Sequence, residues 1–197
     1  FLMQDFLSCY KYASKWVELF YEQENMIELN PVFFLKGNNY LLESLFFLRQ
    51  KKKFDDRLKK LEQTVSDVSF PSNENVASLS FLYINLNKIN AYFIDGTFAD
   101  GLYLIPQIEK QLKSFENTID EHHQMVFYYK FASMHYGAGN NLETIYYLDK
   151  IINNKSLTMR EDLLCFSRIL SLIAHYEAGK DEHLEADLRE VYKFLIK

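Results

Sequence analysis

The sequence predicts an all-α fold built from stacked antiparallel helical hairpins, with about nine helices. The main observation is a pentapeptide, HYGAG at 135–139, that recurs forty residues later as HYEAG at 175–179, each time after a strongly apolar run. A period of about forty residues is typical of helical repeats, in which each unit buries its apolar face only against its neighbours. The chain also has only six Gly and three Pro, too few for the turns of an all-β protein.

The repeat extends toward the N-terminus when its units are aligned on the position of the aromatic residue in the pentapeptide. Tyr92 lies forty-four residues before Tyr136, and Leu48 lies forty-four residues before Tyr92. Helix-start signals keep a similar period, because T-x-x-E capping boxes occur at 118–121 and 158–161 and prolines occur at 31 and 71. These independent markers predict a single repeat domain over 1–197.

The individual helices follow from apolar stripes and from the signals that bound them. Phe6, Cys9, Ala13, Val17 and Phe20 form one stripe at three- and four-residue steps, which predicts a capping helix without a hairpin partner before it. Four hairpins follow, at about 31–68, 74–117, 119–154 and 159–196. The helices are expected at residues 2–25, 31–50, 54–68, 74–94, 98–117, 119–138, 141–154, 159–178 and 182–196.

Breaks between these helices have identifiable causes. The lysines at 51–53 are expected to form a cationic turn in the first hairpin, and residues 69–73 (SFPSN) are expected to separate the first two hairpins. Pro106 should bend the helix at 98–117, because proline removes a backbone hydrogen bond. Gly139 and Gly179 should end their helices in the left-handed conformation.

Composition limits the classes of function. The 197-residue chain has a net charge of −5, which argues against nucleic acid as a partner. The basic cluster from Arg49 to Lys60 is interrupted by Asp55 and Asp56 and is interpreted as a solvated turn and helix face. Cys9 and Cys165 lack CxxC spacing and are expected to be buried small hydrophobes.

No sequence feature predicts a membrane span or a signal peptide, so a cytoplasmic location is expected. The first residue is Phe rather than Met, which suggests an excised fragment or a processed form of a longer protein. A targeting signal or a further domain could then lie outside this chain.

Motifs for catalysis, phosphate loops and metal binding are absent from the sequence, so we expect no enzyme activity, no cofactor and no metal. Glu121-His122-His123 is an adjacent acid–histidine cluster, but neighbouring positions do not share a helix face. His135 and His175 recur at equivalent repeat positions, where we expect them to bond the last carbonyls of their helices. An enzyme with an unrecognised helical active site is a minor alternative.

The turn at Tyr92, Gly96, Phe98 and Gly101 resembles that of a tetratricopeptide repeat, which places an aromatic residue, a turn glycine, a second aromatic residue and a small residue at this spacing. The resemblance covers roughly residues 31–197, and the chain is similar in character to longer-helix bacterial members of that superfamily. It implies a right-handed superhelix of hairpins, an α-solenoid, whose first helices line a concave face.

The resemblance also implies a function, a non-enzymatic scaffold that binds a protein or a peptide on the concave face. An alternative is a peptide-sensing regulatory domain of a larger protein. The positions that match the groove of the family are Asn39, Phe46, Tyr83, Asn90, Phe93, Phe127, Lys130 and Met134.

Overall fold

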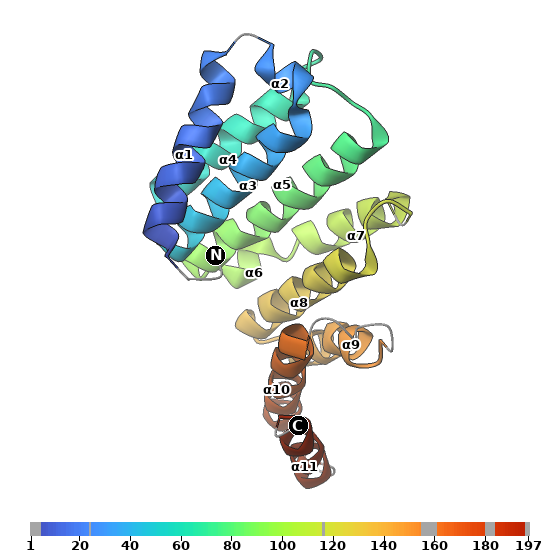
Figure 1. Cartoon of the computed structure of the whole chain (residues 1–197). Coiled ribbons are helices and arrows are strands. Elements are labelled where there is room, and N and C mark those ends of the chain that lie inside the picture. The colour runs from blue at the N-terminus through green and yellow to red at the C-terminus, as the bar shows by residue number, and fades with distance from the viewer. Residues whose placement is uncertain (1–4, 24, 116, 155–160, 180–183, 196–197) are drawn as a thin grey trace. The chain divides into compact units, whose positions relative to one another are not determined.

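The computed structural model describes residues 5–23, 25–115, 117–154, 161–179 and 184–195, and every regular element among them is a helix (Figure 1). The all-α prediction is therefore confirmed. The helices are α1 (Phe6–Glu22), α2 (Met26–Leu29), α3 (Pro31–Phe47), α4 (Lys51–Ser66), α5 (Glu74–Asp95), α6 (Phe98–Gly101), α7 (Leu104–Ser114), α8 (Glu121–Gly137), α9 (Asn141–Ile152), α10 (Glu161–Glu177) and α11 (Leu184–Leu195).

The chain divides into two compact units, Phe1–Gly96 and Thr97–Lys197. The boundary falls inside the predicted second hairpin, after Gly96. In the first unit α3 lies between α1 and α5, and α4 packs against both α3 and α5. In the second unit α8 packs on α9, α9 on α10, and α10 on α11, while α8 also touches α10. Helices that follow one another in the chain thus pair as α3 with α4, α8 with α9 and α10 with α11.

The core of the first unit comes from the apolar faces of α1, α3, α4 and α5. Val17, Phe34, Leu42, Phe54 and Leu61 have no exposed surface. Phe34 lies 5.7 Å from the rings of both Phe20 and Tyr21, in edge-on geometry. Burial of apolar area is the main stabilising contribution here, at about 25 cal/mol per Å² removed from water.

The helix ends confirm two of the predicted terminators. Gly139 has φ +79° and Gly179 has φ +68°, and Gly96 also adopts the left-handed conformation at φ +69°. The amide of Asn140 donates to the carbonyl of His135 at 2.9 Å, which satisfies a carbonyl that the end of α8 would otherwise leave unpaired.

The predicted cationic turn is wrong. Lys51, Lys52 and Lys53 form the first turn of α4, and the chain instead turns through Leu48, Arg49 and Gln50, with Arg49 at φ +52°. Lys51 forms ion pairs with Asp55 in the same helix and with Asp95, whose carboxylate lies 3.2 Å from the ammonium. These carboxylates offset the unfavourable placement of cations at a helix N-terminus.

Two other boundary predictions also need revision. The capping box at Thr118 does not form, because Asp120 caps α8 by accepting a hydrogen bond from the amide of His123 at 2.9 Å. The predicted bend in 98–117 is a full break between α6 and α7, located before Pro106. Pro106 then lies in the first turn of α7, where its missing N–H costs nothing. Thr158, the other predicted cap, lies outside the described residues.

Candidate functional site

Three asparagines link α3 to α5 through a chain of side-chain hydrogen bonds. The amide nitrogen of Asn87 donates to Oδ1 of Asn39 at 3.0 Å, and the amide nitrogen of Asn90 donates to Oδ1 of Asn87 at 3.3 Å. Asn87 also donates to the backbone carbonyl of Tyr83 at 2.8 Å. The structure therefore brings together Asn39 and Asn90, two predicted site residues that are fifty-one positions apart in the sequence.

The central asparagine of this hydrogen-bonded series is buried, and the two outer ones keep a small exposed surface. Asn87 is 1% exposed, whereas Asn39 is 9% and Asn90 is 6% exposed. Polar groups that are removed from water are costly unless they are hydrogen-bonded, and here they bond to one another. We call Asn39, Asn87 and Asn90 the amide row.

Phenol and carboxylate groups flank the amide row. Asn39 donates to the Glu43 carboxylate at 3.1 Å, one helical turn further along α3. Burial raises the pKa of Tyr83, and the nearby Tyr40 and Glu43 raise that pKa further. Tyr83 is half-buried and Tyr40 is exposed, so this face offers hydrogen-bonding groups beside aromatic rings.

The remaining predicted site residues of the first unit are apolar and half-buried. Phe46 packs against the core and lies edge-on to Phe47, with the ring centroids 5.3 Å apart. Phe93 is also half-buried, near the C-terminal end of α5.

The predicted residues of α8 belong to the second unit and have a different environment. Phe127 and Met134 have no exposed surface, and Lys130 is half-buried. A side chain without exposed surface packs the interior. A partner could touch Phe127 or Met134 only if the protein opened, so these two residues serve the core in the conformation described.

Sequence reasoning missed Asn87, although a signal was available. Asn87 follows Glu43 by forty-four residues, the same interval that separates Asn39 from Tyr83 and Phe46 from Asn90. The repeat period therefore also marks Glu43 and Asn87 as equivalent positions of adjacent first helices.

A cluster of tyrosines in the second unit surrounds the ammonium group of Lys150. The nitrogen lies 4.7 Å from the ring centroid of Tyr128, 4.5 Å from that of Tyr146 and 5.4 Å from that of Tyr147. The Glu109 carboxylate is 3.7 Å away. The cation–π contacts link α8 to α9, and the ion pair with Glu109 links α7 to α9. The cation bound by these tyrosines is therefore a lysine of the chain itself.

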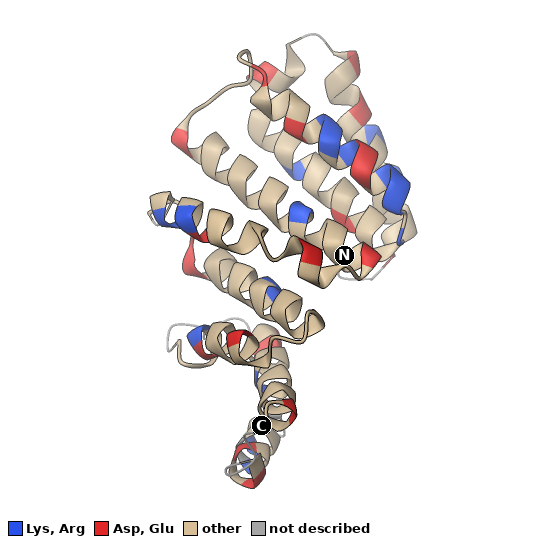
Figure 2. Cartoon of the chain, turned by 180° about the vertical axis from the view of Figure 1, so that it is seen from behind, with Lys and Arg blue, Asp and Glu red and all other residues tan. Residues whose placement is uncertain are grey.

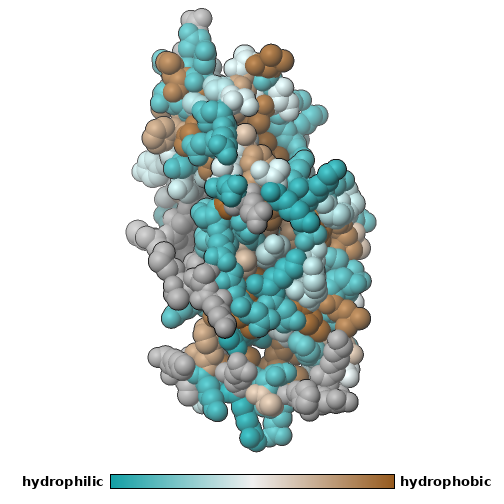
Figure 3. Space-filling view, turned by 90° about the vertical axis from the view of Figure 1, so that its right-hand side faces the viewer, coloured by the Kyte–Doolittle hydropathy of each residue, from teal (hydrophilic) through white to brown (hydrophobic). Residues whose placement is uncertain are grey.

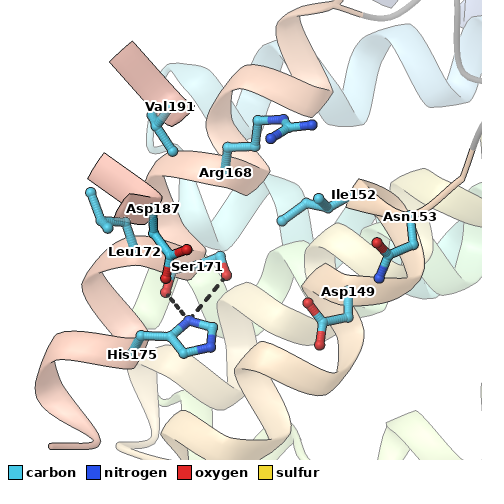
Figure 4. A pocket seen from close by; sticks show the side chains of 9 residues that line it. All are labelled: Asp149, Ile152, Asn153, Arg168, Ser171, Leu172, His175, Asp187 and Val191. Carbon is cyan, nitrogen blue, oxygen red and sulfur yellow. Dashed lines mark hydrogen bonds between the residues drawn. The ribbon is translucent and has the colours of Figure 1, made fainter. Parts of the chain in front are cut away.

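A pocket of about 320 Å³ lies among α9, α10 and α11 (Figure 4). Charges of both signs line it, from Asp149, Asp187 and Arg168. Ser171 and His175 also face it, and Nδ1 of His175 lies 2.8 Å from the carbonyl oxygen of Ser171 and 3.3 Å from its hydroxyl.

This serine and histidine do not form a nucleophile–base pair. A carbonyl oxygen can only accept, so Nδ1 of His175 must carry the proton and donate it. A nitrogen that donates cannot take a proton from the Ser171 hydroxyl, as nucleophilic catalysis would require. The expectation that His175 bonds the last carbonyls of its helix is wrong, because its Nδ1 bonds the carbonyl of Ser171, four residues earlier within α10. His135 instead stacks on Tyr147, with ring centroids 5.6 Å apart.

Within the described parts of the chain, no group of three or more His, Cys, Asp or Glu side chains is arranged to hold a metal ion. No helix in those same ranges has the length and apolar character needed to cross a bilayer. Cys9 and Cys165 are both free thiols and are partly exposed rather than buried as expected. On the face drawn in Figure 3, hydrophilic side chains cover most of the described surface and apolar ones form small separate groups.

No protein-family model, curated protein or solved structure matches this chain.

Proposed function

We propose that the chain is a non-enzymatic scaffold that binds an extended peptide segment on the face formed by α3 and α5. The observation that carries the proposal is the amide row, whose outer members Asn39 and Asn90 reach the surface while Asn87 fixes them from beneath. The tetratricopeptide-like superhelix suggested by the sequence is part of the same proposal.

The chemistry of the row matches a peptide backbone. A carboxamide has both a donor and an acceptor, as a peptide group does, so it can pair with main chain without depending on the side chains of the ligand. Asparagines already held by a neighbouring side chain lose less conformational entropy on binding than free ones would. Tyr40 and Tyr83 lie beside the row and can pack against side chains of the segment.

The test starts from a library of displayed, unstructured heptapeptides selected on the intact protein. The affinity of a selected peptide is then measured by isothermal titration calorimetry for the wild type, Asn39→Ala, Asn90→Ala and the control Asn85→Ala. Asn85 lies on α5, and its one side-chain bond to the described residues is to the carbonyl of Phe81, one turn before it, at 2.8 Å. Loss of one hydrogen bond in a desolvated interface costs about 1 to 3 kcal/mol, so Asn39→Ala and Asn90→Ala should weaken binding by roughly 5- to 150-fold.

Asn85→Ala should leave the affinity within about twofold of the wild type, since surface changes away from the contact have small effects. If Asn39→Ala and Asn90→Ala bind the selected peptides as tightly as Asn85→Ala does, the proposal that peptides bind on the α3–α5 face is rejected. The additional variant Lys130→Ala reports whether the second unit takes part, because Lys130 is the predicted polar position of α8.

A further inference from the structure

A second candidate site of the first unit lies between α1 and α4, in a pocket of about 260 Å³. Leu41 and Leu45 of α3 line it with apolar surface. Tyr10 and Ser14 of α1 and three cations of α4 supply its polar lining. The function proposed above does not involve this pocket.

The three cations share one face of α4. Lys53, Arg57 and Lys60 are spaced at i, i+4 and i+7, so their side chains lie one above another. The Lys53 ammonium lies 5.2 Å from the ring centroid of Tyr10, and the Lys60 ammonium lies 3.6 Å from that of Tyr21. Figure 2 shows Lys and Arg concentrated along this helix.

These cations differ from Lys51 in the first turn of α4. Lys51 is neutralised by Asp55 and Asp95. By contrast, none of the side chains of Lys53, Arg57 and Lys60 forms an ion pair or hydrogen bond with any part of the chain that the structure describes. Their contacts are with aromatic faces.

Arg57 has a specific unmet requirement. Its Nη1 is buried and has no acceptor among the described residues, although a guanidinium can donate five hydrogen bonds. Burial lowers the pKa of Lys60, and the positive charge of Arg57 lowers that pKa further. An anion in the pocket would reduce the repulsion between these two cations.

The carboxylates beside the pocket do not meet that requirement. Glu18 and Asp56 also line it, but both residues are exposed and neither forms an ion pair with the three cations. The lining therefore keeps an excess of one positive charge. The two carboxylates also set a limit on affinity, because they would repel an incoming anion.

We propose that this pocket binds the phosphate group of a small phosphate monoester. A phosphate has three strong acceptor oxygens and close to two negative charges, and a guanidinium fork matches its geometry. The Ser14 hydroxyl is placed to donate a further bond. The pocket volume is below that of a drug-sized ligand site, which fits a phosphate group with a short substituent.

The test uses glycerol 3-phosphate with the full chain, followed by isothermal titration calorimetry at about 50 mM salt, where screening is modest. The pocket variant Lys53→Gln/Lys60→Gln is compared with Lys52→Gln/Lys59→Gln, which removes the same charge from the same helix at positions that do not line the pocket. The pocket variant should weaken binding by about tenfold or more, and the control by about twofold or less, since charge-assisted bonds are stronger than screened surface attraction.

Two further variants keep the test independent of folding defects. Arg57→Lys preserves charge but removes the fork, so it should weaken binding while circular dichroism stays unchanged. Glu18→Gln removes a repelling carboxylate and should tighten binding.

Vesicles of phosphatidylcholine with and without phosphatidylinositol 4-phosphate distinguish a lipid headgroup from a free phosphate ester. Binding of either probe that depends on Lys53 and Lys60 supports the site and identifies its source. The proposal fails if neither probe binds, or if Lys52→Gln/Lys59→Gln weakens binding as much as the pocket variant does.

Discussion

Replacing Asn87 by Ala should destabilise the first unit far more than the same change at Asn85. Asn87→Ala removes the donor to Oδ1 of Asn39 and the acceptor for the amide of Asn90, and both partners are more than nine-tenths buried. A buried polar group left without a partner costs about 1 to 3 kcal/mol. Two such groups, partly rehydrated through their exposed edges, give an expected loss of about 2 to 4 kcal/mol.

Asn85 is a matched control because it lies on the same helix and makes the same kind of bond. Both residues donate to the carbonyl four positions earlier at 2.8 Å, but only Asn87 also bonds to side chains. The gain in helix propensity on changing Asn to Ala, about 0.5 kcal/mol, is common to both variants and cancels. The difference between the two free energies of unfolding therefore isolates the amide row.

The measurement is urea denaturation of the intact chain, followed by circular dichroism at the helical minimum. The double variant Asn39→Ala/Asn87→Ala completes a cycle, and its coupling energy should be about 1 to 2 kcal/mol because the two side chains share a bond. If Asn87→Ala unfolds at the same urea concentration as Asn85→Ala, the three amides do not act as a connected row, and the peptide-binding proposal loses the rigid support it assumes.

Three further changes test the second unit. Gly139→Val should cost about 1 kcal/mol or more, because a β-branched side chain is disfavoured at φ +79°; an unchanged denaturation midpoint would contradict the left-handed helix end. Gly137→Ala should lower the free energy of unfolding by about 1 to 3 kcal/mol through overpacking, since an added Cβ would lie 2.4 Å from the ring of Phe98. The double variant Gly137→Ala/Phe98→Leu should recover part of that stability in the same assay. Burial lowers the pKa of His135 despite the opposing charges of Glu143 and Glu109, so the unfolded chain binds more protons and the free energy of unfolding should fall as the pH drops below about 6.5. In denaturation measured from pH 7.5 to 5, His135→Gln should reduce that fall. An identical pH profile for the variant and the wild type would refute the prediction.

Most of the helices could be predicted because apolar periodicity and helix-end residues are local signals. Gly139 and Gly179 marked their helix ends correctly, since glycine adopts positive φ without a steric penalty. Thr118 misled the prediction because Asp120, two residues closer to α8, competes for the same role and accepts the capping bond. A sequence contains several candidate caps, and the geometry of the preceding loop selects among them.

The lysine turn shows a different kind of failure. Arg49 adopts a left-handed conformation that a non-glycine residue rarely takes, so the true turn carries no sequence signal. The repeat spacing predicts a turn at the lysines, because Leu48 aligns with Tyr92 and a turn follows Tyr92. Asp95 makes a helix start at these lysines tolerable, and it lies forty-four residues from Lys51, at the C-terminal end of α5. Only the fold brings this carboxylate to the helix.

The candidate site was predictable to the extent that it follows the repeat. Asn39 and Asn90 were identified from their positions in adjacent first helices, and the structure joins them through Asn87. The sequence did not predict how deeply each position is buried. Phe127 and Met134 occupy corresponding positions on α8, yet they are fully buried, because a repeat position defines a direction on a helix and not how much of the protein covers it.

The amide row also explains why buried asparagines persist in an otherwise apolar interior. Asparagine is a weak helix former, and its burial is costly unless its donors and acceptors are paired. Asn39, Asn87 and Asn90 meet that condition only when α3 and α5 pack in one register, because a shift of one residue would turn the amides away from one another. The row therefore favours a single packing of the two helices, and the same constraint holds Asn39 and Asn90 in place at the surface. An interface that is fixed before its partner arrives loses less entropy on binding, which is the property that a peptide-binding scaffold requires.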